Sequence, residues 1–203
     1  MNRLTFVCLL FSLLLYGCAS ETNTINYYKL GAVNKAFNPD NTGNGKSNRS
    51  NRSLIVIEPI LLPDFLRQQG LVIQKTDHQL QISNNHRWAE SLESAISRVV
   101  QSHLENQLPE YRFENQTGRW KLKPQFRLSI ELAEFQVNNR ESKVITSGRF
   151  WIFNQNEELV SKERFLIEES LSSNGYEHAI SNLEITLNKL VDKLGSAIKV
   201  LAN

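Results

Sequence analysis

Cysteine is almost missing from this chain of 203 residues: there are two, Cys8 and Cys18, and both stand near its start. If the chain is cut before Cys18, the mature protein keeps one cysteine, so no disulfide can form within it. The charges are nearly balanced, with 23 Lys and Arg against 21 Asp and Glu. This balance argues against the basic footprint of a protein that binds nucleic acid.

A long apolar run is missing as well. The apolar residues from Leu4 to Tyr16 follow Arg3 and precede Gly17 and Cys18, which is the order of a secretory signal peptide. A membrane-crossing helix needs about 20 apolar residues, so this run would span a bilayer poorly. We therefore predict that the chain is exported and that residues 1–17 are removed.

Leu15-Tyr16-Gly17-Cys18 has the pattern of a bacterial lipobox. The pattern predicts cleavage between Gly17 and Cys18 and covalent attachment of a diacylglycerol and an N-acyl chain to Cys18, with no other cofactor. Two acyl chains already suffice for stable membrane attachment. The alternative is an ordinary signal peptide that leaves Cys18 as a free thiol.

The residue after the cysteine predicts which membrane receives the anchor. An Asp at that position retains such lipoproteins in the inner membrane, whereas this chain has Ala19. We therefore expect a lipid-anchored protein of the outer membrane that faces the periplasm.

After the anchor, residues 18–26 form a polar tether, and residues 27–203 have a length that suits one domain. The segment 38–53 contains no large apolar residue that could offset the entropy of ordering it. We interpret it as a flexible polar insertion in the domain.

Several segments have the composition of strands. Residues 54–57 form a β-branched run that suits a strand buried on both faces, and residues 71–73 and 79–82 can pair as a hairpin. Three apolar-rich segments, about 124–137, 143–154 and 159–168, predict an antiparallel meander. In the first of them the apolar parity changes, which a bulge near Ala133 and Glu134 would explain.

Two amphipathic helices complete the prediction. The first has its apolar stripe from Trp88 to Leu108 and ends before Pro109, and the second begins at Asn174, with Glu177 as capping-box partner. Because a sheet needs a cover, we expect both helices to pack on it, although the second stripe would also suit an inter-chain coiled coil. The predicted fold is a single-domain α+β structure: an antiparallel sheet covered by two long helices.

The sequence offers little for catalysis or metal binding. The four histidines, His78, His86, His103 and His178, are not spaced as metal ligands, and no nucleophile with an orienting base is recognisable. We therefore predict no catalytic and no metal site. Trp120, Trp151 and Phe153 could form a face that meets lipid or a partner, or could be covered on both sides of the sheet.

The order of several short motifs adds a family resemblance. Tyr27-Tyr28-x-Leu30 comes first, then the 54–57 strand, then a segment that begins Leu62-Pro63-x-Phe65-Leu66, and finally Arg87-Trp88-Ala89-Glu90-x-Leu92. This order resembles the ABC-type transport auxiliary lipoproteins over nearly all of the mature chain. Two departures are Ser91, where the family commonly has proline, and the 38–53 insertion.

The resemblance implies a non-catalytic accessory protein, a homo-oligomer that docks an MCE-domain channel protein and its inner-membrane partner to outer-membrane lipid and supports membrane integrity. Two residues, Arg67 and Glu90, are the candidate partner-binding residues. The other motif residues have a mainly structural interpretation: Pro63, Phe65, Leu66, Trp88 and Ala89. The alternative function is a periplasmic lipid-binding shuttle, and an envelope hydrolase is the least supported.

Overall fold

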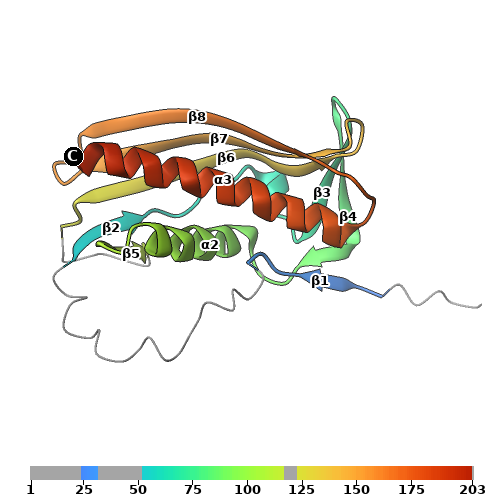
Figure 1. Cartoon of the computed structure of the whole chain (residues 1–203). Coiled ribbons are helices and arrows are strands. Elements are labelled where there is room, and N and C mark those ends of the chain that lie inside the picture. Colours follow the sequence, from blue (N-terminus) through green and yellow to red (C-terminus); the bar gives the residue numbers. More distant parts are fainter. Residues whose placement is uncertain (1–23, 32–51, 117–122, 203) are drawn as a thin grey trace, which may run out of the picture.

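The computed structural model describes residues 24–31, 52–116 and 123–202. The predicted cleavage and lipidation site at Gly17 and Cys18, nearly all of the 38–53 insertion and Trp120 lie outside these ranges. Eight strands and two helices are arranged as in Figure 1. They are β1 (Asn26–Tyr28), β2 (Ser53–Ile57), β3 (Gly70–Thr76), β4 (Gln79–Trp88), α2 (Leu92–Gln107), β5 (Tyr111–Asn115), β6 (Phe126–Asn138), β7 (Lys143–Asn154), β8 (Leu159–Ser170) and α3 (Tyr176–Ala202), with a short 3₁₀ turn η2 (Asp64–Leu66) after β2.

The eight strands form one mixed sheet, so the prediction of a wholly antiparallel sheet is wrong. Strands β6, β7 and β8 pair antiparallel in chain order, as do β3 and β4. In contrast, β6 pairs in parallel with both β2 and β3, and β2 pairs in parallel with β5. The parallel neighbours are joined by long connections, including α2, and such pairings leave no local turn signal in the sequence.

The β3–β4 hairpin and the bulge in β6 were predicted correctly. Residues Leu132 and Glu134 are consecutive partners of β7, so Ala133 is the extra residue. This bulge returns Phe135 to the buried face of the sheet, where it is 2% exposed. A side chain on Gly148, opposite the bulge, would lie only 2.0 Å from the Glu131 carbonyl oxygen, so only glycine fits there.

Helix α2 begins later than predicted. The Trp88 amide donates to the Gln69 carbonyl at 2.7 Å, which continues strand β4 through Trp88. The helix starts at Leu92 because the Ser91 hydroxyl accepts from the Ser94 amide and caps it. Spacing alone misassigned Trp88, which stands four residues before Leu92 and matches a helical stripe by coincidence. In α3, Gly175 rather than Asn174 precedes the first helical residue.

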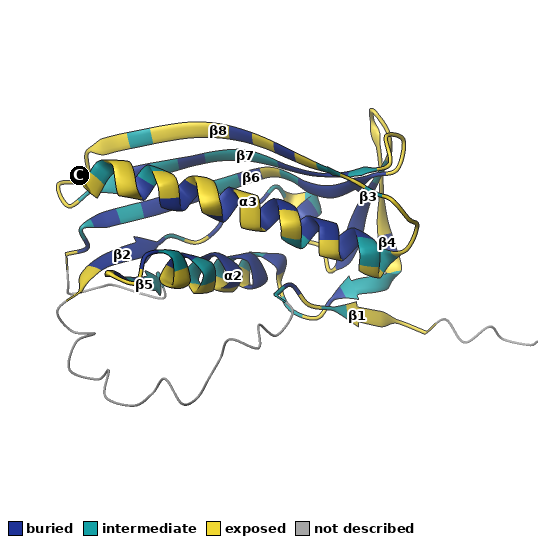
Figure 2. Cartoon of the chain, in the orientation of Figure 1, coloured by how far each residue is buried: buried dark blue, intermediate teal, exposed yellow. Residues whose placement is uncertain are grey.

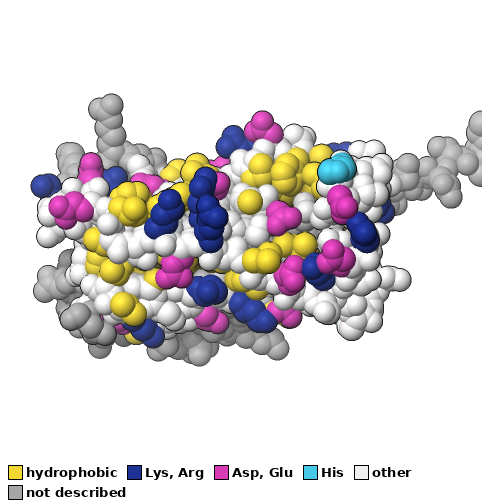
Figure 3. Space-filling view, turned by 90° about the horizontal axis from the view of Figure 1, so that it is seen from above, with side chains coloured by type: hydrophobic (Ala, Val, Ile, Leu, Met, Phe, Trp, Pro, Cys, Tyr) yellow, Lys and Arg dark blue, Asp and Glu magenta, His cyan; other side chains and the backbone are white. Residues whose placement is uncertain are grey.

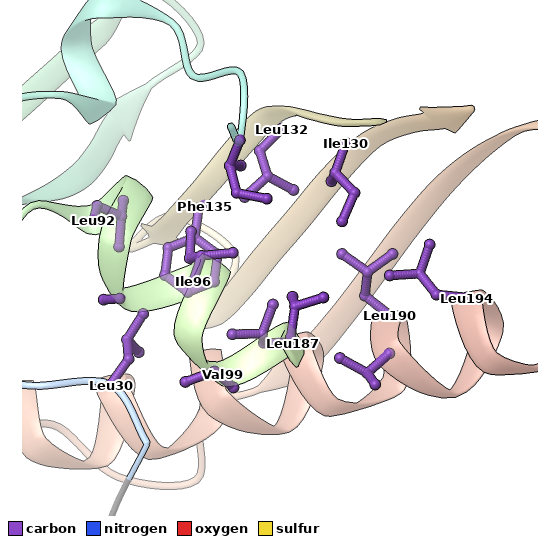
Figure 4. Close-up of a cluster of buried hydrophobic side chains, with 14 of the residues drawn as sticks. Leu30, Leu92, Ile96, Val99, Ile130, Leu132, Phe135, Leu187, Leu190 and Leu194 are labelled. Carbon is purple, nitrogen blue, oxygen red and sulfur yellow. The ribbon is translucent and has the colours of Figure 1, made fainter. Parts of the chain in front are cut away.

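Both helices cover the same face of the sheet, and their buried residues point toward it (Figures 1 and 2). The predicted apolar stripe of α3 is buried, including Leu187, Leu190 and Leu194 at 0% exposure. Figure 4 shows these leucines with Ile130 of β6 and with Ile96 of α2 in one hydrophobic cluster. Burial of each such side chain contributes about 1.5–3 kcal/mol, which is what holds both helices on the sheet.

Candidate functional site

The first described segment of the chain is held tightly by the domain. Strand β1 lies beside β4 in parallel, with Tyr28 opposite Trp88. Two residues later, Leu30 is fully buried in the main core, next to Val99 of α2 (Figure 4). We call residues 26–31 the N-terminal clamp, because they join the first described part of the chain to the domain.

Three hydrogen bonds from separate elements fix the backbone of the clamp. The Ala89 amide donates to the Tyr28 carbonyl at 2.7 Å, and Arg98 Nη2 of α2 donates to the Leu30 carbonyl at 3.0 Å. The Gly31 amide donates to Glu184 Oε1 of α3 at 2.6 Å. Gly31 has φ of +74°, and a Cβ there would lie 3.0 Å from Val99 Cγ2, so glycine suits this sharp exit.

An aromatic stack closes the clamp from the side of β4 and α3. The Tyr28 hydroxyl and His86 Nδ1 are hydrogen bonded at 2.8 Å, and the His86 ring stacks on Tyr176 with centroids 3.5 Å apart. Burial raises the pKa of the Tyr28 phenol above its ordinary 10.0, and the nearby charge of Glu177 raises that pKa further. The stack therefore joins β1, β4 and the first turn of α3 around a neutral phenol.

The structure brings two parts of the family motif together, the segment that begins at Leu62-Pro63 and the segment that begins at Arg87-Trp88. Pro63 precedes the short turn η2, and Leu66 in that turn is buried. The chain then meets the end of β4, where Gly70 pairs with Arg87 and the Gln69 carbonyl accepts from Trp88. Trp88 itself is buried and contacts Phe135, with ring centroids 6.4 Å apart.

The two candidate partner-binding residues, Arg67 and Glu90, lie at the surface in different local contacts. Arg67 is exposed, and its Nε donates to the Leu62 carbonyl at 3.1 Å. Glu90 forms an ion pair with Arg98, the same side chain that holds Leu30. Glu90 thus supports the clamp rather than capping α2, a role that sequence reasoning missed because Arg98 is eight residues away.

The face of the sheet that carries no helix has partly exposed aromatic residues. Trp151 and Phe153 of β7 lie beside Leu61 and Arg127 in a shallow surface hollow of about 510 Å³. Arg149 stacks over Trp151, with its Cζ 5.0 Å from the ring centroid. The sequence left two interpretations of these aromatics: a face that meets lipid or a partner, and a sheet covered on both sides. Among the described residues, the structure supports a partly open face.

Four carboxylates of β6 and β8 are engaged in contacts within the domain. Glu131 accepts two hydrogen bonds of 3.0 Å from Arg149, and Glu134 accepts from the Ser147 hydroxyl at 2.5 Å. Glu168 pairs with Lys143, and Glu169 pairs with Lys189. Within the described ranges no group of three or more His, Cys, Asp or Glu residues is placed to hold a metal ion.

The sequence from residue 37 to residue 195 matches the family of ABC-type transport auxiliary lipoprotein components. The chain therefore belongs to this family of transport lipoproteins, which is not known as an enzyme family. In the part of the chain that the structure describes, no helix is both long and apolar enough to cross a membrane.

Among individual relatives, the chain is similar to the intermembrane transport lipoprotein PqiC of Escherichia coli K12, with 28% identity over 94% of this chain and 95% of PqiC. PqiC of Shigella flexneri has the same identity and coverage. A solved structure of an uncharacterised protein superposes with a TM-score of 0.69 at 23% identity, covering 86% of this chain and 99% of that one. A protein from Xanthomonas campestris has a TM-score of 0.64 at 12% identity, over 84% and 92% of the two chains, which supports the fold alone.

Proposed function

We propose that this protein is the outer-membrane accessory lipoprotein of an intermembrane lipid transport system. In this role the chain is lipidated on Cys18, faces the periplasm, and docks the end of an MCE-domain channel to the outer membrane without catalysing a reaction. Family membership and the similarity to PqiC over nearly the whole chain support the transport role.

The N-terminal clamp is the observation that carries the proposal. A lipoprotein that is anchored in the membrane but binds no partner could tolerate a flexible junction between its anchor and its domain. Here the junction is held by a buried leucine, by three hydrogen bonds to Ala89, Arg98 and Glu184, and by the Tyr28–His86 contact. This arrangement suits a protein that must transmit force between a membrane anchor and a docked partner.

Homo-oligomerisation around the channel tip belongs to the same proposal. A ring of identical subunits would match a channel with rotational symmetry, because cyclic symmetry repeats one interface around the axis. The oligomeric state is measured by mass photometry of the detergent-solubilised protein. We expect one species whose mass is a whole-number multiple of the subunit mass. A monomer at all concentrations, even with the channel protein present, would contradict this part.

The proposal is tested by affinity capture of the tagged lipidated protein from gently solubilised envelopes, with mass spectrometry of both proteins and lipids. We expect an MCE-domain protein and its inner-membrane partner in the eluate. The control is a Cys18→Ser variant, which should be released from the membrane fraction. Lipid recovered without such a partner would instead favour the lipid-binding shuttle.

Arg67→Ala and Glu90→Ala test the docking residues. Both side chains are at the surface, and exposed ion pairs such as Glu90–Arg98 contribute only about 0–1 kcal/mol, so the melting temperature should stay nearly unchanged. We expect each variant to recover several-fold less of the channel protein than the wild type. Lys75→Ala, another exposed cation, is the control. Equal capture by all variants would assign Arg67 and Glu90 to the fold alone.

A further inference from the structure

One part of the helix-free face has the side chains of a membrane-contacting surface. Thr146 of β7 lies 2.6 Å from Thr186 of α3, so even-numbered residues of β7 face the helix and odd-numbered ones face away from it. Pairing with β8 places Trp151 opposite Lys162, Arg149 opposite Arg164, and Ser147 opposite Leu166. We call Arg149, Trp151, Lys162, Arg164 and Leu166 the β7–β8 strip.

The charges of the strip are incompletely neutralised. Arg149 is paired with Glu131, whereas neither Lys162 nor Arg164 forms an ion pair with any residue in the described ranges. Both side chains are exposed, and Arg164 stands directly across from Arg149. Like charges directly opposite each other destabilise a sheet, so an anion bound between them would relieve repulsion.

The apolar members of the strip fit a bilayer interface. Leu166 is 63% exposed, although it lies in the middle of a strand. Trp151 is half-buried, and tryptophan is enriched where a membrane meets water, as are Lys and Arg beside anionic lipid headgroups. Figure 3 views the molecule from above and shows Lys and Arg side chains beside hydrophobic ones on that side.

The proposed anchor holds the start of the domain near a membrane. Five residues lie between Cys18 and Thr24, the first described residue, and an extended chain spans at most about 3.6 Å per residue. The domain thus begins within roughly 20 Å of the lipidated cysteine. At this distance a weak surface contact is sufficient, because the anchor has already brought the two surfaces together.

From these observations we infer that the β7–β8 strip rests on the surface of a bilayer that contains anionic phospholipid. The inference relies on the proposed lipid anchor and adds an orientation to it: the helix-free face of β7 and β8 lies on the membrane, and the two helices face away from it. Lys162 and Arg164 bind phosphate groups, and Leu166 and Trp151 reach the boundary with the acyl chains.

The experiment uses the lipidated mature chain in phosphatidylethanolamine vesicles with or without phosphatidylglycerol. Leu166→Cys is labelled with an environment-sensitive fluorophore, and Ile185→Cys, an exposed position on α3, is the matched control. Acylation of Cys18 leaves the new cysteine as the reactive thiol. We expect a blue-shifted emission at position 166 when phosphatidylglycerol is present, no shift at position 185, and loss of the shift at high salt.

Charge reversal separates the strip from other cations. The double substitution Lys162→Glu and Arg164→Glu should abolish the shift at position 166. The same change at Lys193 and Lys199 of α3, which are also exposed and without an ion pair among the described residues, should leave it intact. Circular dichroism checks that each variant is folded.

Three results would overturn the inference. The first is an equal emission shift at positions 166 and 185, and the second is a shift that depends on Lys193 and Lys199. The third is shielding of position 166 only when the transport partner is added, because the strip would then be a protein interface. In each case the chain can still sediment with the vesicles through its acyl chains, so the proposed anchor and transport role would stand. A chain that fails to sediment would refute the anchor instead.

Discussion

The two faces of the β6–β7–β8 sheet use neighbouring residues of the same strand for different purposes. On β7, Phe150 and Ile152 point toward the helices and are fully buried, whereas Trp151 and Phe153 point away and stay partly exposed. All four are large and apolar, so composition alone does not separate them. The difference comes from the helices, which cover only one side of the sheet.

This comparison teaches that stability and surface recognition are separable within one strand. The covered face supplies the packing that keeps α2 and α3 in place. The open face contributes less to packing, so its Trp151 and its arginines can be changed with little effect on folding. The stability predictions below compare a position on the covered side with one on the exposed side, and the last prediction is a pH dependence at the clamp.

The largest expected effect is that of Phe150→Ala. Removal of this fully buried ring should lower the free energy of unfolding by about 3–5 kcal/mol, because a cavity is left between β7 and the helices. Trp151→Ala removes a larger side chain but should cost clearly less, since one side of the ring already meets solvent. Urea unfolding of both variants measures the difference, and equal losses would show that the open face is packed in the folded protein.

The N-terminal clamp also has a buried side and an exposed side. Leu30→Ala should cost about 2–5 kcal/mol, because Leu30 is 0% exposed in the main core. Tyr27→Ala, on the other side of β1, should change stability by no more than about 0.5 kcal/mol, since Tyr27 is 61% exposed. If both variants have the same urea midpoint of unfolding as the wild type, the clamp does not hold the N-terminal segment to the domain.

A buried hydroxyl pair gives a smaller effect. Thr186 donates to the Leu183 carbonyl at 2.8 Å, so the hydroxyl of Thr146, 2.6 Å from that of Thr186, acts as donor to it. Thr186→Val leaves the Thr146 hydroxyl buried without an acceptor and should cost about 1–3 kcal/mol. Thr146→Val leaves Thr186 bonded and should cost less.

The matched contact on the open face is the ion pair between Arg149 and Glu131. Both side chains are partly exposed, so Arg149→Met should cost only about 0–1 kcal/mol. A double-mutant cycle for each pair checks the comparison by chemical denaturation. A larger coupling for the ion pair than for the threonines would show that solvent does not reach the open face.

Local sequence patterns predicted the elements that local chemistry determines. The stripe of α3, the β3–β4 hairpin and the bulge at Ala133 all follow from periodicity or parity. The parallel pairings of β1 with β4 and of β2 with its neighbours could not be predicted, because residues distant in sequence meet only after folding. Strand β5 was missed for the same reason.

The candidate site shows the same division. Leu30 and Tyr28 belonged to a motif that was noticed, yet their partners Arg98, His86 and Tyr176 come from three other elements. Ser91 was the signal that could have corrected the start of α2. Serine with an extended backbone before a helix is a favoured cap, and that signal outweighs the chance spacing of Trp88.

The smallest expected effect is a pH dependence at the clamp. Burial and the charge of Glu177 raise the pKa of Tyr28 above 10.0 in the folded protein. As the pH rises through the ordinary pKa, Tyr28 loses its phenolic proton in the unfolded chain but still retains it in the folded chain. The free energy of unfolding therefore falls as pH rises. Tyr28→Phe removes this contribution, and the stability difference between wild type and variant should shrink from about pH 8 to about pH 11.

Tyr111, whose pKa is also raised by burial, is present in both proteins and cancels in this difference. The measurement therefore isolates the phenol of the clamp from the other alkaline titrations of the chain. A difference that stays constant with pH would mean that solvent reaches Tyr28 in the folded state. In that case Leu30 and the three backbone hydrogen bonds would have to hold the N-terminal segment without the aromatic stack.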